Sequence, residues 1–379
     1  MEYKTFNNPL LLLLSKKDLQ LFLSNNIWKI DILAPDIYLI YIYDKDNVLI
    51  EKYNISLKDK ELTIIIEIYN GTKEINLPFY FALDIFYDIR NDVDIRYITI
   101  TKKTSIDGIK KFHGNIKKTQ LQHVINKLRK TGTIKNIALL DLCCGKGNDM
   151  AKWHSLGIHN VVGIDYSEES ILDAQHRFFA KNYPSSYNVH FIRSDVGAVD
   201  PTANKYLSNF LTSISTPDET NKKFDIVSCN FAIHYMYAHE ANLRNFMAII
   251  NKYLRIGGYF IGTTLNKDLI LKLFPKKETS FSAPLLEITP KEHFFDNSKI
   301  YGRKYGIRIG LVGENTYTGK EESNEFLVDF REMRAIAYKN GLMLIELVNF
   351  NQIAGHDKLN QNEKPASWLN TKFMFYKQF

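Results

Sequence analysis

The sequence predicts an α/β protein in which a doubly wound, mostly parallel sheet with helices on both faces follows a smaller strand-rich module. Residues 1 to about 100 alternate apolar and polar positions at the two-residue period of strands. From about residue 105, short apolar segments alternate with helical segments. A glycine-rich turn joins the first of these apolar segments to the next helix. We therefore predict two domains in the 379 residues, 1–104 and 105–379.

The predicted N-terminal module is dense in Ile, Tyr and Val, and "DKDN" and "YNGTKE" supply its turns. It contains no catalytic pattern. Its apolar run at residues 9–14, "PLLLLL", is too short to span a bilayer and has no charged leader or cleavage site. We expect a protein that is neither membrane-bound nor secreted.

The predicted second domain alternates helices and strands in chain order. "KKTQLQHVINKLRKTG" predicts a helix that ends at Gly132. The predicted strands are "IALLDL", "NVVGIDY", "VHFIRSD", "FDIVSCNFAIHY" and "GGYFIGTTL", with helices after the first, second and fourth. Residues 215–223 are expected to form a surface loop. Residues 275–324 are polar and irregular and are expected to be an insertion, after which a helix, a strand and a last strand, "KFMFYK", follow.

Composition restricts the class of protein only weakly. The net charge of +7 is compatible with an acidic partner such as nucleic acid, but many soluble enzymes reach it. The 3 cysteines include the adjacent Cys143 and Cys144 and show neither a disulfide framework nor zinc spacing. We expect a reducing compartment, cytoplasmic or nuclear, and no metal.

The glycine turn lies in "LLDLCCGKGNDMAKW", residues 139–153. A strand, a glycine turn and a helix form a nucleotide-binding device, because glycines let the backbone approach a ligand and the helix start offers free amides. The stretch is not G-x-G-x-x-G, so a turn that serves only the fold is the alternative.

Acidic residues around this turn favour a cofactor. Asp165 ends the second strand, about 20 residues past the turn, where a carboxylate binds ribose hydroxyls. Asp195 ends the third strand, where an adenine would lie. Asp141 and Asp149 flank the turn and would repel a pyrophosphate. A ligand with adenosine at one end and positive charge at the other is S-adenosylmethionine.

The order of motifs resembles the mRNA cap guanine-N7 methyltransferases, which are class I S-adenosylmethionine-dependent enzymes. The motifs are D-L-x-C-G-K-G-x-D, Asp165, "FDIVSCNFAIHY", "GGYFIGTT" and "NEFLVDF". F-x-x-H-Y after the fourth strand and E-[FY]-L-V-x-F near the end are the most specific. The resemblance runs from about Phe112 to the C-terminus. It implies a Rossmann-like fold and methyl transfer to guanine N7 of 5′-capped RNA, leaving S-adenosylhomocysteine.

The resemblance also implies a cofactor site. The first acids and small residues of the turn would line the methionine half, Asp165 would bind ribose, and Asp195 with the next amide would bind adenine. Asn230 stands where the family usually has Gln. "FHGNIKK" points to Lys117, with Lys118 one register away. The implied cofactor residues are Lys117, Asp141, Cys143, Gly145, Asp149, Asp165, Asp195, Val196, Asn230 and Tyr235.

The implied cap site has an aromatic platform and a guanine reader. Phe231 would pack on guanine, since base stacking is worth about 1–3 kcal/mol. Glu325 would accept the N1 and N2 hydrogens, a contact that adenine lacks. His234 and Tyr235 would flank the methyl-transfer path. Lys146 and Arg177 would meet the triphosphate.

Ordinary structural roles are the alternatives for these residues. Taken singly, Phe231 could be core, His234 a structural histidine and Tyr235 a strand-end cap. Glu325, Arg177 and the pair Lys117–Lys118 could be solvated charges. Their joint order and spacing favour the functional interpretation.

Three departures from the family pattern bear on affinity. Cys143 replaces a glycine, and Leu265 replaces a proline. Asn370 stands where the family has a tyrosine that closes over guanine. Trp368 is the candidate substitute, or the pocket is more open.

Guanine N7 carries a free lone pair, so the implied reaction is an in-line displacement that needs no general base. We assign no catalytic acid or base, and we assign positioning roles to His234, Tyr235 and Glu325.

Two other functions stay open: a class I methyltransferase for another substrate, and a non-catalytic or stimulatory subunit of a capping complex. A 2′-O-methyltransferase is disfavoured because we find no Lys-Asp-Lys-Glu tetrad. Three roles stay open for the N-terminal module: docking of a capping-enzyme partner, RNA binding, or no role, as a remnant of a larger capping polypeptide. Cytoplasmic capping by a large DNA virus or an extrachromosomal element would suit so divergent a member.

Overall fold

The computed structural model describes residues 106–379 except 131–135, 182, 185, 199–200, 216–221 and 311–321, and the backbone of five strands between residues 27 and 78. The chain divides into two compact units, residues 1–100 with 175–183 and residues 101–174 with 184–379. The apolar run at residues 9–14 and most of the expected loop at 215–223 lie outside the described residues. The boundary at residue 104 stays a prediction.

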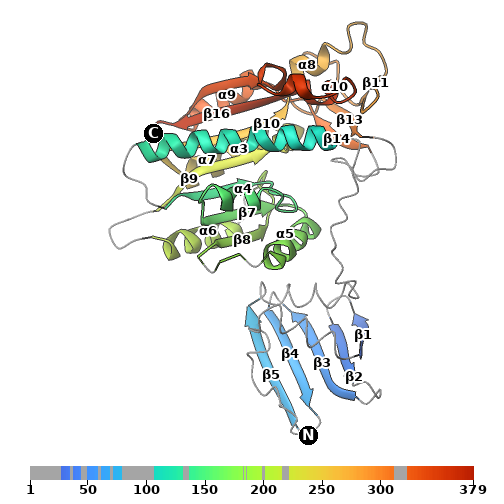
Figure 1. The fold of residues 1–379 in the computed structure, drawn as a ribbon, viewed down its shortest axis with the longest axis vertical. Coiled ribbons are helices and arrows are strands. Elements are labelled where there is room, and N and C mark those ends of the chain that lie inside the picture. Colours follow the sequence, from blue (N-terminus) through green and yellow to red (C-terminus); the bar gives the residue numbers. More distant parts are fainter. Residues whose placement is uncertain are drawn as a thin grey trace. The chain divides into compact units, whose positions relative to one another are not determined.

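The N-terminal strands form an antiparallel sheet in which each strand pairs with the next along the chain (Figure 1). They are β1 (Ile27–Ala34), β2 (Ile37–Tyr43), β3 (Leu49–Lys58), β4 (Glu61–Ile68) and β5 (Gly71–Pro78). The alternating sequence pattern predicts strands in this region.

The larger unit is built on a seven-stranded sheet of order β15-β16-β10-β9-β6-β7-β8 (Figure 1). Its strands are β6 (Ala138–Leu142), β7 (Asn160–Asp165), β8 (Asn188–Arg193), β9 (Phe224–Asn230), β10 (Leu254–Leu265), β15 (Leu342–Asn349) and β16 (Asn370–Lys377). Neighbours from β8 to β10 are parallel, whereas β16 is antiparallel to both β10 and β15. The prediction of a mostly parallel sheet with helices on both faces is therefore confirmed, and β16 is the antiparallel strand near one edge.

Helices cover both faces of this sheet. They are α3 (Asp107–Lys130), α4 (Met150–Ser155), α5 (Glu168–Ala180), α6 (Pro201–Ser213), α7 (Glu240–Tyr253), α8 (Lys267–Leu271), α9 (Phe330–Lys339) and α10 (Lys364–Trp368). Alternate strand residues such as Leu140 and Leu142 share one core with α6, α7 and α9. Leu139, which precedes Leu140, is equally buried but is not part of this core, as expected for a side chain on the opposite face. Figure 1 shows α3 crossing the sheet, where it contacts β9 and β10.

A second, four-stranded antiparallel sheet occupies the segment expected to be an irregular insertion. It consists of β11 (Phe281–Ala283), β12 (Leu286–Pro290), β13 (Lys304–Ile309) and β14 (Ser323–Phe326). Its inner face buries Leu286, Ile288, Tyr305 and Ile307 in a core with α8. The prediction of irregular structure at 275–324 is therefore wrong for the strands within it.

Other elements also differ from the prediction, and the short helices α8 and α10 were not predicted. Helix α3 begins at Asp107, ten residues before the predicted segment. Helix α6 was not predicted. The predicted strand "FDIVSCNFAIHY" ends at Asn230, and the 3₁₀ helix η2 (Ile233–Ala238) follows it.

Candidate active site

A cavity of about 300 Å³ lies where β6, β9 and β10 end, with walls also from α3, β13, β14 and β16. Its lining residues are His113, Lys117, Asp141, Cys143, Cys144, Gly145, Asn148, Asp149, Asn230, Phe231, His234, Tyr235, Leu265, Ile309, Ser323, Glu325 and Asn370. A volume of this size lies at the lower end of ligand-binding pockets.

Ten of the residues singled out in the sequence meet in this one cavity. They are Lys117, Asp141, Cys143, Gly145, Asp149, Asn230, Phe231, His234, Tyr235 and Glu325. Lys118, the neighbouring alternative to Lys117, is exposed on the outer side of α3. Leu265 and Asn370, which depart from the family pattern, line it too, whereas Lys146, Asp165, Arg177, Asp195, Val196 and Trp368 do not.

The glycine turn has the backbone geometry of a ligand-approach site. Cys143, Gly145 and Gly147 have φ angles of 59°, 53° and 66°, in the left-handed region that favours glycine. A Cβ added to Gly145 would meet no atom within 4 Å, so open space adjoins the backbone there. Cys143 adopts this conformation although it carries a Cβ, which is sterically unfavourable in the left-handed region. The family's glycine would avoid this strain.

Asp165 supports the turn from the end of β7. Its Oδ2 accepts a hydrogen bond from the amide of Gly145 at 2.7 Å, and its Oδ1 accepts one from the amide of Ser167 at 3.0 Å. Asp165 therefore lies directly behind a cavity-lining amide although it does not line the cavity itself.

The two acids that flank the turn have different electrostatic environments. Burial, reinforced by neighbouring Asp149, raises the pKa of Asp141 to about 7, although Ser228 donates a hydrogen bond to it. Burial would also raise the pKa of Asp149, but Lys117 and Lys152 outweigh it and the pKa is lowered. Lys117 Nζ lies 2.7 Å and Lys152 Nζ 2.6 Å from its carboxylate. The negative charge of Asp149, which we expected to attract a cationic ligand, is therefore partly neutralised by these two lysines.

Phe231 forms the aromatic wall of the cavity just after β9. Its φ angle is 56°, and its amide donates to Thr263 O at 2.7 Å, which fixes an uncommon backbone conformation. Its ring stacks on His113 at a centroid distance of 5.2 Å and an interplanar angle of 21°. Lys117 Nζ lies 5.9 Å from the ring centroid.

His113 is a buried cavity residue that the sequence reasoning missed. Burial, with Lys117 and His356 nearby, lowers its pKa to about 3, and its Nε2 lies 3.1 Å from Ser367 Oγ. Its spacing of four residues from Lys117 places both on one face of α3, and that spacing was the available signal.

His234 and Glu325 face each other deep in the cavity, with His234 Nε2 3.7 Å from Glu325 Oε1. Burial lowers the pKa of His234 to about 3 and raises that of Glu325 to about 7. Tyr305 on β13 donates a hydrogen bond to Glu325 Oε2 at 2.9 Å. Oε1 is left facing His234, and Tyr235 beside it is 45% exposed.

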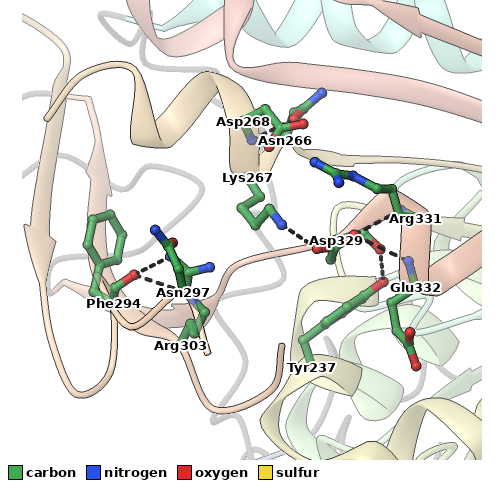
Figure 2. A network of polar contacts seen from close by, with 10 residues as sticks. All are labelled: Tyr237, Asn266, Lys267, Asp268, Phe294, Asn297, Arg303, Asp329, Arg331 and Glu332. Atoms are coloured by element: carbon green, nitrogen blue, oxygen red, sulfur yellow. Dashed lines mark hydrogen bonds and ion pairs between the residues drawn. The ribbon is translucent and has the colours of Figure 1, made fainter. Parts of the chain in front are cut away.

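A polar network fixes the segment that follows Glu325 (Figure 2). The carboxylate of Asp329 accepts from the Lys267 ammonium and from the amides of Arg331 and Glu332, and its carbonyl accepts from the Tyr237 hydroxyl at 2.7 Å. This ties the start of α9 to α8 and η2. The strand that carries Glu325 is thereby anchored at its carboxyl end.

Residues assigned to the triphosphate and to adenine lie outside the cavity. Lys146 pairs with Asp173 at 2.6 Å and Glu169 at 3.3 Å, and Arg177 lies on α5. Asp195 follows β8 and accepts from the Gly197 amide at 2.8 Å. Val196 is buried and lines a separate hollow next to α6 and α7.

The proposed replacement of the cap-closing tyrosine receives no support. Asn370 lines the cavity, is buried and donates to the carbonyls of Ala366 and Ser367. Trp368 ends α10, is 40% exposed and lies outside the lining. Leu265, at the position of the family's proline, lines the cavity.

Within the part of the chain that the structure describes, no group of three or more His, Cys, Asp or Glu side chains is arranged to hold a metal ion. None of the helices in that part of the chain has the length and apolar character needed to cross a bilayer.

Comparison with known proteins gives a consistent set of relatives. The model of the mRNA (guanine-N(7))-methyltransferase domain matches residues 86–373. The mRNA cap guanine-N(7) methyltransferase of Schizosaccharomyces pombe is 28% identical over 260 residues, which are 68% of this chain and 66% of that protein. That of Saccharomyces cerevisiae is 28% identical over 237 residues, 60% of this chain and 50% of that protein. The matched region spans less than two thirds of the length of these relatives.

Among solved structures, a S-adenosylmethionine-dependent methyltransferase from Clostridium acetobutylicum is similar with a TM-score of 0.44 at 14% identity. The match covers 79% of this chain and 99% of that chain.

Proposed function

The chain belongs to the mRNA (guanine-N(7))-methyltransferase domain family, and on that premise we propose that it transfers a methyl group from S-adenosylmethionine to N7 of the guanine in 5′-capped RNA. The single observation that carries the proposal is that the glycine turn and Glu325, 180 residues apart in the sequence, line one cavity. A cofactor site and a guanine reader must share a space if one ligand is to alkylate the other.

The turn fits an adenosyl cofactor with a cationic methionine end. Open space beside Gly145 gives a ligand access to the backbone. Asp141 and Asp149 offer carboxylates to the α-ammonium, and Asp165 would bind the ribose at the end of β7. Asp195 and Val196 would bind the adenine further along the same sheet edge.

The opposite wall fits a guanine. Phe231 offers an aromatic face to a flat base, and Glu325 Oε1 is the oxygen that Tyr305 leaves unoccupied. An ionised carboxylate accepts from N1–H and N2–H of guanine, whereas adenine presents no such pair. Lys146 and Arg177 would meet the triphosphate, for which Lys146 must release Asp173.

The chemistry requires alignment more than proton transfer. The bound sulfonium supplies the methyl group, and guanine N7 attacks with its own lone pair. His234 is neutral and therefore adds no repulsion to the positive charge that moves toward N7. His234, Tyr235 and Glu325 act as positioning groups, and no side chain serves as a general base.

Methyl transfer from labelled S-adenosylmethionine to GpppG-RNA, with ApppG-RNA as the matched control, tests the proposal. We expect label only in the guanine-capped RNA. Equal labelling of both would indicate another methylation site. Cofactor binding without turnover on either RNA would indicate a non-catalytic subunit of a capping complex.

The region before the catalytic domain is proposed to serve a capping-enzyme partner or RNA, in the cytoplasm or nucleus where transcripts are capped. Comparing cap methylation by the full chain with that by residues 105–379 tests this role. Equal KM and kcat for both proteins would show that the N-terminal module does not contribute to cap methylation.

A further inference from the structure

Helix α3 carries almost all of the excess positive charge of the chain. Its 24 residues include seven Lys or Arg and one acid, Asp107, which is a net +6 of the chain's +7. The remaining 355 residues carry 42 basic and 41 acidic side chains and are nearly neutral. The excess of basic over acidic residues therefore comes almost wholly from this one element.

The outer face of α3 is a continuous polar stripe without acids. We name it the α3 stripe: Lys111, Asn115, Lys118, Gln122, Asn126 and Arg129. These positions recur at three- and four-residue spacing and so lie on one face, all exposed except half-exposed Gln122. The stripe is about 27 Å long at 1.5 Å per residue.

The cations of this stripe are not used to hold the fold. Among the described residues, no carboxylate lies within ion-pair distance of Lys111, Lys118 or Arg129. Lys117, on the inner side of the same helix, is in contrast paired with Asp149. Three outward cations with amide side chains between them can contact phosphates and base edges.

The helix that carries the stripe also forms a wall of the candidate active site with its opposite, inner face. His113 and Lys117 of α3 line the cavity, so a transcript whose cap lies there starts beside this helix. We propose that α3 is the track for the RNA that follows the cap, with the α3 stripe contacting its single-stranded phosphate backbone. This inference rests on the proposed function and extends it from the cap to the transcript.

The alternative of an anionic membrane surface fits less well. A membrane-binding helix needs apolar side chains beside its cations. The apolar residues of α3, such as Phe112, Leu121 and Val124, are buried in the domain, and no large apolar side chain of α3 is exposed.

The test is the triple variant Lys111→Ala/Lys118→Ala/Arg129→Ala in the full chain. Steady-state methylation is measured with GpppG and with a capped RNA of about 20 nucleotides. We expect KM for the capped RNA to rise at least about tenfold, with kcat and the KM for GpppG unchanged. The slope of log affinity against log salt should fall by about 2, since each lost single-strand contact removes about 0.7.

The matched control is Lys272→Ala/Lys276→Ala/Lys277→Ala, which removes three exposed positive charges from another surface. It should leave all of these values unchanged. An equal rise in KM with both substrates, or the same loss in the control, would overturn the proposal.

Binding of an uncapped RNA of about 20 nucleotides, followed by fluorescence anisotropy, separates this proposal from the proposed function. If the wild type methylates neither substrate, the proposed function fails. A selective loss of RNA affinity in the triple variant would still support the track. Unchanged RNA affinity in the triple variant would refute the track. It would also be refuted if the variant lost binding to phosphatidylserine vesicles but kept its RNA affinity.

Discussion

His234 Nε2 lies 3.7 Å from Glu325 Oε1, yet at neutral pH the two side chains do not form an ion pair. Burial lowers the pKa of His234 to about 3, so the imidazole is neutral. The same burial raises the pKa of Glu325 to about 7. The distance exceeds a hydrogen bond, and no described residue offers Nε2 of His234 another partner. Two polar atoms are therefore held ready for a ligand.

Glu325 should make cap methylation pH-dependent. Guanine presents two hydrogens, so the carboxyl must be ionised to accept both, and its raised pKa places that ionisation near pH 7. We expect kcat/KM for capped RNA to rise as the pH increases through about 7. Glu325→Gln should lower kcat/KM about 10- to 100-fold and abolish this rise, while cofactor affinity by calorimetry is kept.

Tyr305→Phe is the matched variant for that titration. The Tyr305 hydroxyl stabilises the ionised carboxylate by donating to Oε2, so its removal should raise the pKa of Glu325 further. The rise in kcat/KM should then move to higher pH. A profile that stays in place in this variant, or one that persists in Glu325→Gln, would assign the titration to another group.

Asp165 should control cofactor binding through two contacts at once. It is proposed to bind the ribose, and it holds the Gly145 amide at 2.7 Å. Asp165→Ala should lower the affinity for S-adenosylhomocysteine at least about 10-fold by calorimetry, since hydrogen bonds to charged groups are worth about 1.5–3 kcal/mol. Asp165→Asn keeps the shape and should lose less. Unchanged binding in Asp165→Ala would refute the ribose assignment.

The central sheet could be predicted from the sequence because parallel strands buried on both faces read as continuous apolar runs. The strands at Ala138–Leu142 and Phe224–Asn230 are of this kind. Strands β12 and β13 are not, since one face carries ion pairs such as Arg308–Glu287 at 2.6 Å, and the segment therefore read as irregular. Helix α6 was missed although Pro201 at its start and Leu207, Phe210 and Leu211 at helical spacing were available signals.

The sequence predicts a site residue correctly where that residue lies at the carboxyl end of a strand that is itself predictable. Asp141 and Asn230 follow from the positions of β6 and β9. Ser323 and Ile309 line the cavity only because the second sheet folds over it, which no local pattern indicates. The choice of Lys117 over Lys118 likewise needed the rotation of α3 against the sheet.

Cys143 should tolerate glycine better than valine. Its φ angle of 59° is in the left-handed region, where a β-branched side chain is strained and glycine is not. We expect Cys143→Gly to change the free energy of unfolding by no more than about 1 kcal/mol, and Cys143→Val to lower it by about 2 kcal/mol or more. Urea unfolding with both variants measures this. Equal effects of the two substitutions would mean that packing, and not backbone strain, governs the position.

Asp141 should make the ligand-free protein less stable as the pH rises. Its pKa is about 7 in the folded chain against about 4 when unfolded, so the folded state holds the proton more tightly. The resulting stability is fully present below about pH 4 and is lost as the pH rises through about 7. Asp141→Asn stays uncharged, so its free energy of unfolding should match that of the wild type near pH 4 and exceed it by on the order of 1–3 kcal/mol near pH 8.

Denaturant unfolding across this pH range measures the difference. The control is Asp225→Asn, which changes a buried acid that is paired with Arg255 outside the cavity. Parallel stability curves for the wild type and Asp141→Asn would show that the carboxyl is ionised throughout.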